Sequence, residues 1–145
     1  MIAFVLRLPF HSNTAQINIG EYTSRRTDMA VDTKTALITG GAHGIGFACA
    51  KRLSASGSNI VLLDTDADAL AHAKEQFVGQ PVHTVIADIT DYTAIEDAIK
   101  RVDQEFSPIT QMVNSAGIAG PNTTVEDYPT RDWQQIMDIN LTGSF

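Results

Sequence analysis

The chain has 145 residues, of which 43% are hydrophobic, and carries a formal net charge of −7. This length predicts a single domain, and the hydrophobic fraction is sufficient for a globular core. An acidic chain without a basic cluster argues against nucleic acid or an anionic membrane surface as a partner.

The cysteine and histidine content excludes two kinds of site. Cys49 is the single cysteine, so no internal disulfide can form, and a reducing compartment such as the cytoplasm is expected. The four histidines, His11, His43, His72 and His83, are scattered without the spacing of metal ligands. We therefore expect a cytoplasmic protein without a metal site.

Residues 1–30 differ in character from the rest of the chain. Met1–Leu8 is apolar but is interrupted by Arg7, so it is too short to span a membrane. It also lacks the basic start and the cleavage site of a signal peptide. We expect residues 1–30 to be a disordered leader, with Met29 as the natural start and a folded domain over 31–145.

The segment Thr35–Gly46 has the pattern of a strand, a glycine-rich turn and a helix. This order places a helix N-terminus, with free backbone N–H groups and the positive end of the dipole, where a phosphate can bind. In such a turn Gly40 would turn the chain, Gly44 would let pyrophosphate approach and Gly46 would let the helix pack closely. A glycine cluster alone also fits an ordinary tight turn.

The second apolar run, residues 59–63, is followed by Asp64, which lies 18 residues beyond Gly46. A carboxylate near this distance binds a ribose 2′-hydroxyl, although a solvated residue at a strand end is the alternative. Asp64 would repel a 2′-phosphate, and only His43 in the glycine-rich turn could compensate in part. The sequence therefore predicts NAD in preference to NADP.

Strands and helices alternate along the remainder of the chain. Residues 91–106 form the clearest helix, with Asp91 as its cap, an apolar i, i+3, i+4, i+7 pattern and a Glu96–Lys100 pair. Further helices are expected over about 44–56 and 66–77 and from 130, and further strands over 82–87 and 110–113. This alternation predicts an α/β fold, a doubly wound parallel sheet of the Rossmann type with three α/β/α layers.

Five motifs occur in order: Thr39-Gly40-x-x-x-Gly44-x-Gly46, Asp64, Asp88-Ile89-Thr90, Asn114-Ser115-Ala116-Gly117 and Asp138-Ile139-Asn140-Leu141-Thr142-Gly143. In these motifs the chain from about Thr33 to Phe145 resembles the N-terminal, cofactor-binding half of the classical short-chain dehydrogenase/reductase family. The resemblance implies hydride transfer between NAD and an alcohol or carbonyl substrate of the sugar, polyol or 3-oxoacyl type. It also implies a homo-oligomer, dimer or tetramer, for a full-length protein.

The resemblance assigns site residues by their place in these motifs. Asn140 matches the asparagine of the family's catalytic tetrad. The expected cofactor-binding residues are Thr39, Gly40, His43, Gly44, Ile45, Gly46, Asp64, Asp88, Ile89, Asn114, Ala116 and Gly117. Ser115 departs from the family, which has a second asparagine at that position, so a contact that braces the central strand is in doubt.

Structural roles remain open for three of these residues. Asp88 could be a turn or cap residue before the helix that Asp91 begins. Asn114 could tie adjacent strands together through its amide. Asn140 shares an apolar helix face, expected to face inward, with Trp133, a predicted core residue, and its amide must find partners there.

The family's acid/base pair, Tyr-x-x-x-Lys, does not occur in the sequence. The tyrosines, Tyr22, Tyr92 and Tyr128, are followed four residues later by Arg26, Glu96 and Asp132. We therefore expect an incomplete domain that ends after the fourth strand and the start of the next helix, and that has no dehydrogenase activity alone. It would expose a central strand edge and an apolar sheet face. The alternative is a truncated, non-catalytic NAD-binding or interaction module.

Overall fold

The computed structural model describes residues 4–7 and 33–145. It contains one five-stranded sheet with the order β1-β5-β2-β3-β4. The strands are β1 (Phe4–Arg7), β2 (Thr35–Thr39), β3 (Asn59–Asp64), β4 (Val82–Ile86) and β5 (Gln111–Asn114). The helices are α2 (Gly44–Ser54), α3 (Ala67–Glu75), α4 (Tyr92–Glu105), α5 (Thr130–Met137) and the π-helical segment η1 (Asp138–Thr142).

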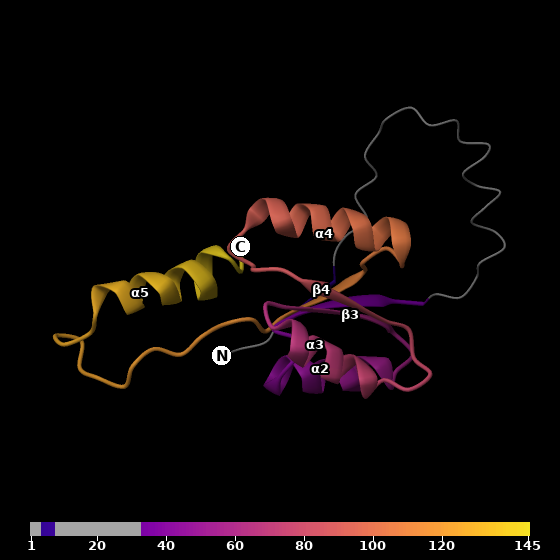
Figure 1. The fold of residues 1–145 in the computed structure, drawn as a ribbon, viewed down its shortest axis with the longest axis horizontal. Coiled ribbons are helices and arrows are strands. Elements are labelled where there is room, and N and C mark those ends of the chain that lie inside the picture. Colours follow the sequence, from indigo (N-terminus) through magenta and orange to yellow (C-terminus); the bar gives the residue numbers. More distant parts are fainter. Residues whose placement is uncertain (1–3, 8–32) are drawn as a thin grey trace, which may run out of the picture.

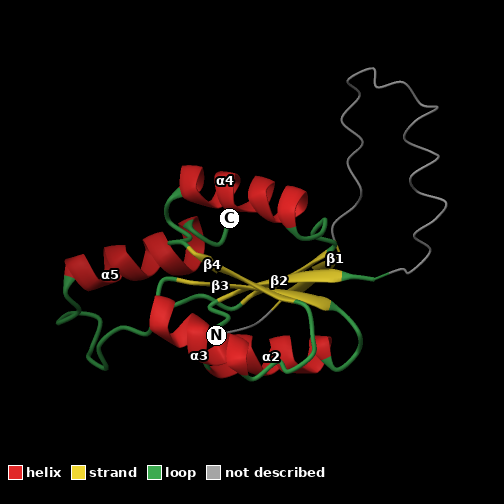
Figure 2. Cartoon of the chain, turned by 45° about the vertical axis from the view of Figure 1, so that its right-hand side comes forward, coloured by secondary structure: helices red, strands yellow, loops and turns green. Residues whose placement is uncertain are grey.

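The sheet lies between two layers of helices, as the alternation of elements predicts. Helices α2 and α3 lie on one face of the sheet and α4 lies on the other (Figures 1 and 2). Strands β2, β3, β4 and β5 are parallel to one another, whereas β1 is antiparallel to β5. The prediction of a Rossmann-type, doubly wound α/β fold is therefore confirmed.

Two apolar clusters, one on each face, hold the layers together. On the face of α2 and α3, Ile38, Ile60 and Leu62 pack with Ala50 and Leu70. On the face of α4, the strand residues Leu37, Val61 and Leu63 pack with Ala98 and Val102. All five residues of β2 are buried, which is expected for a parallel strand that is covered on both faces.

Aspartate side chains fix where two of the helices begin. Asp91 accepts a hydrogen bond from the Ala94 N–H (3.0 Å), so the predicted cap of α4 is confirmed. Asp66 caps α3 in the same way through the Ala69 N–H (2.9 Å). On the exposed side of α4, Glu96 and Lys100 form the predicted ion pair at 3.1 Å.

The outer edge of β5 is covered, contrary to the expectation of an exposed central strand edge. Residues Phe4–Arg7, which lie in the segment expected to be a leader, form β1 and pair with Gln111–Asn114. This strand is not predicted from the sequence, because four residues are too few for a clear period-2 pattern. The rest of the expected leader, residues 1–3 and 8–30, lies outside the described residues.

Helix α5 does not place an apolar stripe in the core. Trp133 is 56% exposed and Leu141 in η1 is 59% exposed, so the prediction that Trp133 is a core residue is wrong. Figure 1 shows α5 beside the sheet rather than stacked over it. Trp133 instead makes an edge-to-face contact with Tyr128, with the ring centroids 6.3 Å apart. Ile136 and Met137 on the same stripe are half-buried, so the described residues cover the stripe only in part.

Candidate functional site

A cleft of about 410 Å³ lies where the parallel strands end. Residues that follow the carboxyl ends of β2, β3, β4 and β5 line it, and since the strands are parallel these ends share one edge of the sheet. The chain proceeds outward from β2 to β4 and then crosses to β5 on the other side of β2. Such a reversal of strand order leaves a crevice in which α/β proteins bind ligands. The lining residues are Gly40, His43, Gly44, Ile45, Leu63, Asp64, Thr65, Ala87, Asp88, Ile89, Ser115, Ala116, Gly117, Ile118 and Ile139.

The glycine-rich turn closely approaches the segment that follows β5. Gly40 has a φ of +61°, and a Cβ atom there would lie 2.9 Å from the Ala116 backbone. A Cβ atom on Gly46 would lie 2.2 Å from the carbonyl oxygen of Gly40. A side chain at either position would therefore displace the backbone, so both glycines are required by close packing.

The N-terminus of α2 faces the cleft without a side-chain cap. His43 is the N-cap residue and its side chain makes no capping hydrogen bond, and the first turn contains no acidic residue. Gly44 and Ile45 of this first turn line the cleft. The first backbone N–H groups of a helix have no partner within the helix, and together with the dipole they favour an anion.

Asp64 connects the end of β3 to the glycine-rich turn. Its Oδ2 accepts a hydrogen bond from the Ala42 N–H (3.1 Å), while its Oδ1 accepts from the Thr65 N–H (2.9 Å) and the Asp66 N–H (3.3 Å). These three backbone donors fix the orientation of the carboxylate at the cleft wall. No lysine or arginine is among the lining residues, so the carboxylate has no cationic neighbour there.

Asp88 lines the opposite part of the cleft and also forms a local turn. Its Oδ1 accepts hydrogen bonds from the Thr90 N–H (2.9 Å) and the Thr90 hydroxyl (2.8 Å). This is the turn role that the sequence left open for Asp88. The Oδ2 atom accepts no hydrogen bond from the described residues, so a turn role and a ligand contact are compatible.

Thr39 and Asn114, the last residues of β2 and β5, do not line the cleft. The Thr39 hydroxyl donates to Asn114 Oδ1 (2.8 Å) and accepts from the N–H groups of Ser115 and Ala116 (both 3.1 Å). Asn114 also donates through Nδ2 to the Ser144 carbonyl oxygen (3.4 Å). This network ties β2, β5 and the last residues of the chain together, which is the structural role proposed for Asn114.

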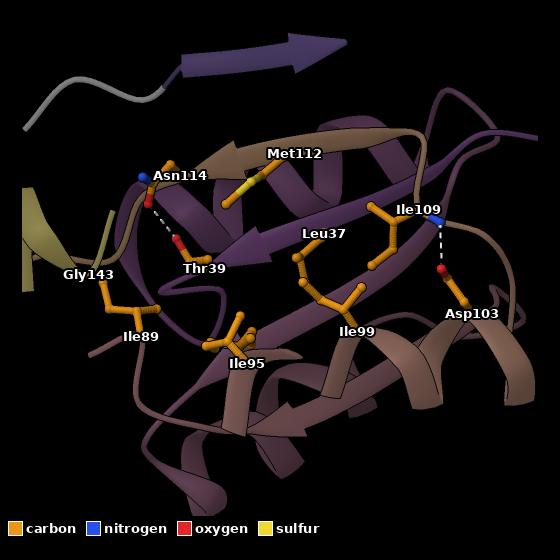
Figure 3. A pocket seen from close by; sticks show the side chains of 11 residues that line it. Leu37, Thr39, Ile89, Ile95, Ile99, Asp103, Ile109, Met112, Asn114 and Gly143 are labelled. Carbon is orange, nitrogen blue, oxygen red and sulfur yellow. Dashed lines mark hydrogen bonds between the residues drawn. The ribbon is translucent and has the colours of Figure 1, made fainter. Parts of the chain in front are cut away.

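The side chains of Thr39 and Asn114 line a second, apolar groove of about 260 Å³ between the sheet and α4 (Figure 3). Ile95 and Ile99 of α4 form one wall, and Leu37 and Met112 of the sheet form the other (Figure 3). The groove borders the cleft, because Leu63 and Ile89 line both, but neither Asp64 nor Asp88 lines the groove.

Asn140 contacts the loop after β5 rather than the cleft itself. Its Oδ1 accepts from the Ile118 N–H and its Nδ2 donates to the Ile118 carbonyl oxygen, each at 2.9 Å. Because Ile118 and Ile139 line the cleft, this pair of hydrogen bonds fixes one wall of it. The amide of Asn140 therefore finds the partners that the sequence analysis required, although the residue is exposed rather than facing inward.

The structure brings most of the predicted site residues into one cleft. Those that line it are Gly40, His43, Gly44, Ile45, Asp64, Asp88, Ile89, Ala116 and Gly117. Those that do not are Thr39, Gly46, Asn114 and Asn140, which pack or position its walls. Three further lining residues, Thr65, Ala87 and Ser115, were not among the predicted site residues, although each is a direct neighbour of one at a strand end.

The described residues, 4–7 and 33–145, contain neither a cluster of metal ligands nor a membrane-spanning helix. Among them, no three side chains of His, Cys, Asp or Glu lie close enough together to hold a metal ion. None of the helices in this part of the chain is long and apolar enough to cross a membrane.

A parallel sheet with a glycine-rich turn, an uncapped helix N-terminus and an acidic residue at the end of the next strand defines a Rossmann-type domain. The family model described as short chain dehydrogenase matches residues 34–145. The chain belongs to this family, which confirms the resemblance found in the sequence.

Individual relatives agree with this assignment. The chain is 34% identical, over 112 residues, to 2-dehydro-3-deoxy-L-rhamnonate dehydrogenase (NAD(+)) of Sphingomonas sp. (strain SKA58), covering 77% of this chain and 44% of that protein. It is 37% identical, over 117 residues, to D-beta-hydroxybutyrate dehydrogenase of Rhizobium meliloti (strain 1021), covering 78% and 45%. A crystal structure of NAD+-bound xylitol dehydrogenase superposes with a TM-score of 0.72 at 32% identity, covering 77% and 44%. The chain thus spans slightly under half the length of these relatives.

Proposed function

We propose that this chain is the cofactor-binding part of an NAD-dependent oxidoreductase, which transfers hydride between nicotinamide and an alcohol or carbonyl substrate. The observation that carries the proposal is the position of Asp64, whose carboxylate is held beside the glycine-rich turn by the Ala42 N–H. Family membership and relatives named as dehydrogenases of sugar acids, polyols and hydroxybutyrate support it. The proposed substrate class is accordingly sugar, polyol or 3-oxoacyl.

The described residues fit a dinucleotide by the chemistry of their donors and acceptors. The uncapped N–H groups of Gly44 and Ile45 would hold the pyrophosphate, and Asp64 would accept hydrogen bonds from the adenine-side ribose. The free Oδ2 of Asp88 and the adjacent Ile89 would contact the adenine ring. When bound, NAD supplies the hydride acceptor, while these residues bind and orient it.

Asp64 also carries the proposed choice of NAD over NADP. A carboxylate repels a 2′-phosphate, and the lining of the cleft contains no lysine or arginine to offset that repulsion. Of the lining residues, His43 has the side chain that could offset it in part. We therefore expect NAD+ to bind at least about tenfold more tightly than NADP+, a difference of about 1.4 kcal/mol.

Calorimetric titration of the 145-residue chain with NAD+ and with NADP+ tests both parts of the proposal. The Asp64→Asn variant keeps a hydrogen-bond acceptor but removes the charge. The ratio of the dissociation constant of NADP+ to that of NAD+ should therefore decrease. Asp97→Asn makes the same charge change on the exposed side of α4 and should leave both affinities unchanged. A folded chain that binds neither nucleotide would contradict the cofactor-binding role, and equal affinities would contradict only the NAD preference.

The second candidate is a non-catalytic NAD-binding or interaction module. This candidate applies to a protein in which no Tyr-x-x-x-Lys pair accompanies these 145 residues, which themselves contain none. The cleft side chains that can exchange protons, His43, Asp64 and Asp88, are assigned here to cofactor binding. Without the Tyr-x-x-x-Lys pair the family's acid/base is missing, so we propose that these 145 residues alone have no dehydrogenase activity. NAD-dependent turnover by the purified 145-residue chain would refute this. For both candidates we propose a cytoplasmic location. A homo-oligomer is proposed only for a longer protein that contains the Tyr-x-x-x-Lys pair.

A further inference from the structure

Ser115 is a buried residue of the cleft lining whose hydroxyl has no hydrogen-bond partner among the residues that the structure describes. Its exposed fraction is 4%, and it lines the cleft next to Ala116. The backbone N–H of Ser115 donates to the Thr39 hydroxyl at 3.1 Å, whereas the hydroxyl of Ser115 itself makes no such bond. A buried hydroxyl without a partner costs free energy, so a ligand that supplies a partner gains by binding there.

The hydroxyl oxygen of Ser115 opens into the cleft. Within residues 4–7 and 33–145, every fully enclosed side-chain nitrogen or oxygen atom has a hydrogen-bond partner. Since the Ser115 hydroxyl has none there, its oxygen is not fully enclosed, and the residue lines the cleft. A group that reaches this buried hydroxyl must therefore enter through the cleft.

The Ser115 side chain lies against the first turn of α2. A Cβ atom on Gly46 would be 3.3 Å from the Ser115 Cβ. The preceding residue, Asn114, lines the groove under α4 instead (Figure 3). Ser115 therefore adjoins the helix turn that provides the N–H groups of Gly44 and Ile45, to which we assign the pyrophosphate.

We propose that Ser115 is a further cofactor-binding residue, whose hydroxyl donates a hydrogen bond to a pyrophosphate oxygen of the dinucleotide. The oxygens of a pyrophosphate only accept hydrogen bonds, and a serine hydroxyl can rotate its hydrogen toward them. The family's asparagine at this position has a longer side chain, so the serine leaves its shorter polar group free for the ligand. This inference rests on the proposed function, because it takes the cleft as the nucleotide site.

Calorimetric titration of the 145-residue chain and of its Ser115→Ala variant tests this assignment with NAD+, ADP and adenosine as probes. Loss of a hydrogen bond to a charged group should weaken the binding of NAD+ and ADP by about tenfold. Adenosine has no phosphate, so it should bind both chains equally. Ser54→Ala is the matched control, because Ser54 is 5% exposed within α2 and does not line the cleft. It should leave all three affinities unchanged.

Urea unfolding without nucleotide distinguishes a binding role from a structural role. In the free chain the Ser115 hydroxyl has no partner to lose, so Ser115→Ala should unfold at the same urea concentration as the wild-type chain. Ser115→Cys provides a second variant that nearly keeps the size of the side chain but donates only weakly. It should show most of the loss in NAD+ and ADP affinity.

Three results would overturn the assignment of Ser115. The first is a folded Ser115→Ala chain with wild-type affinity for NAD+ and ADP. The second is an equal loss of affinity for adenosine, which would show that the hydroxyl does not serve the pyrophosphate. The third is unfolding of both Ser115 variants at lower urea concentration, which would indicate a structural role. A wild-type chain that folds but binds none of the probes would instead contradict the proposed function, and with it this inference.

Discussion

Asn140 and Ile118 form a reciprocal pair of hydrogen bonds in which one side-chain amide satisfies both backbone groups of one residue. The N–H and the carbonyl oxygen of Ile118 each lie 2.9 Å from the Asn140 amide. This contact joins η1 to the loop after β5, and both segments contribute to the wall of the cleft. Asn140 is therefore a positioning residue in this chain, and its proposed catalytic role depends on what it holds in place.

Replacement of Asn140 by alanine should lower stability and weaken nucleotide binding together. Two hydrogen bonds are lost at a site that water can reach, so we expect the free energy of unfolding to fall by about 1 kcal/mol. Urea unfolding followed by circular dichroism measures this change, and calorimetry measures the accompanying loss of NAD+ affinity.

Asn122→Ala is the control for this prediction, because Asn122 is exposed in the same connecting segment and makes no hydrogen bond within the described residues. It should leave both quantities within error of the wild-type values. An Asn140→Ala variant with wild-type stability and affinity would show that the pair does not position the cleft wall.

The alternation of elements was predictable from the sequence because each boundary carries a local chemical signal. Asp91 begins α4 by capping it, and the glycines after Thr39 end β2 sharply. Strand β1 had no such signal. Its existence depends on backbone pairing with β5, which lies more than 100 residues away in the chain.

The sequence predicted which strand ends carry the site, but it did not predict the direction in which each side chain points. The motifs place Asn114, Ser115 and Ala116 together at the end of β5, yet successive residues of a strand point to opposite faces. Asn114 consequently faces the groove under α4, where it accepts from Thr39. For α5, the pattern predicted an apolar stripe correctly, but the burial of Trp133 required a covering surface that the sequence does not specify.

Replacement of Asp91 by alanine should destabilise the domain more than removal of the nearby ion pair. The carboxylate of Asp91 caps the Ala94 N–H, and loss of such a cap costs about 1 kcal/mol. Lys100→Ala breaks the exposed pair with Glu96, which should cost less than about 0.5 kcal/mol. Thermal unfolding of the two variants measures the difference, and Asp91→Ser should recover most of the lost stability. Equal losses for Asp91→Ala and Lys100→Ala would contradict the capping role.

Replacement of Gly46 by alanine should be more damaging than replacement of Gly57. The new methyl group at position 46 would lie 2.2 Å from the Gly40 carbonyl oxygen, so the glycine-rich turn must move away from α2. Overpacking of this kind costs about 1–3 kcal/mol. At Gly57, where φ is +88° and no atom lies within 4 Å of the added carbon, only backbone strain of about 1–2 kcal/mol applies. Both variants should unfold at a lower urea concentration than the wild-type chain, but only Gly46→Ala should also bind NAD+ more weakly. An unchanged NAD+ affinity of Gly46→Ala would show that the glycine-rich turn tolerates the shift.

Replacement of Thr39 by valine tests the contribution of the hydroxyl to stability at nearly constant side-chain volume. The hydroxyl donates to Asn114 and accepts from two backbone N–H groups, and Thr39 is only 3% exposed. Valine keeps the volume but leaves buried donors unpaired, so we expect a loss of about 2–3 kcal/mol in the free energy of unfolding. Thr39→Ser keeps the hydroxyl and should lose about 1 kcal/mol, the transfer free energy of one methyl group. Equilibrium denaturation distinguishes the two, and a valine variant as stable as the serine variant would mean that packing rather than this network holds β2 to β5.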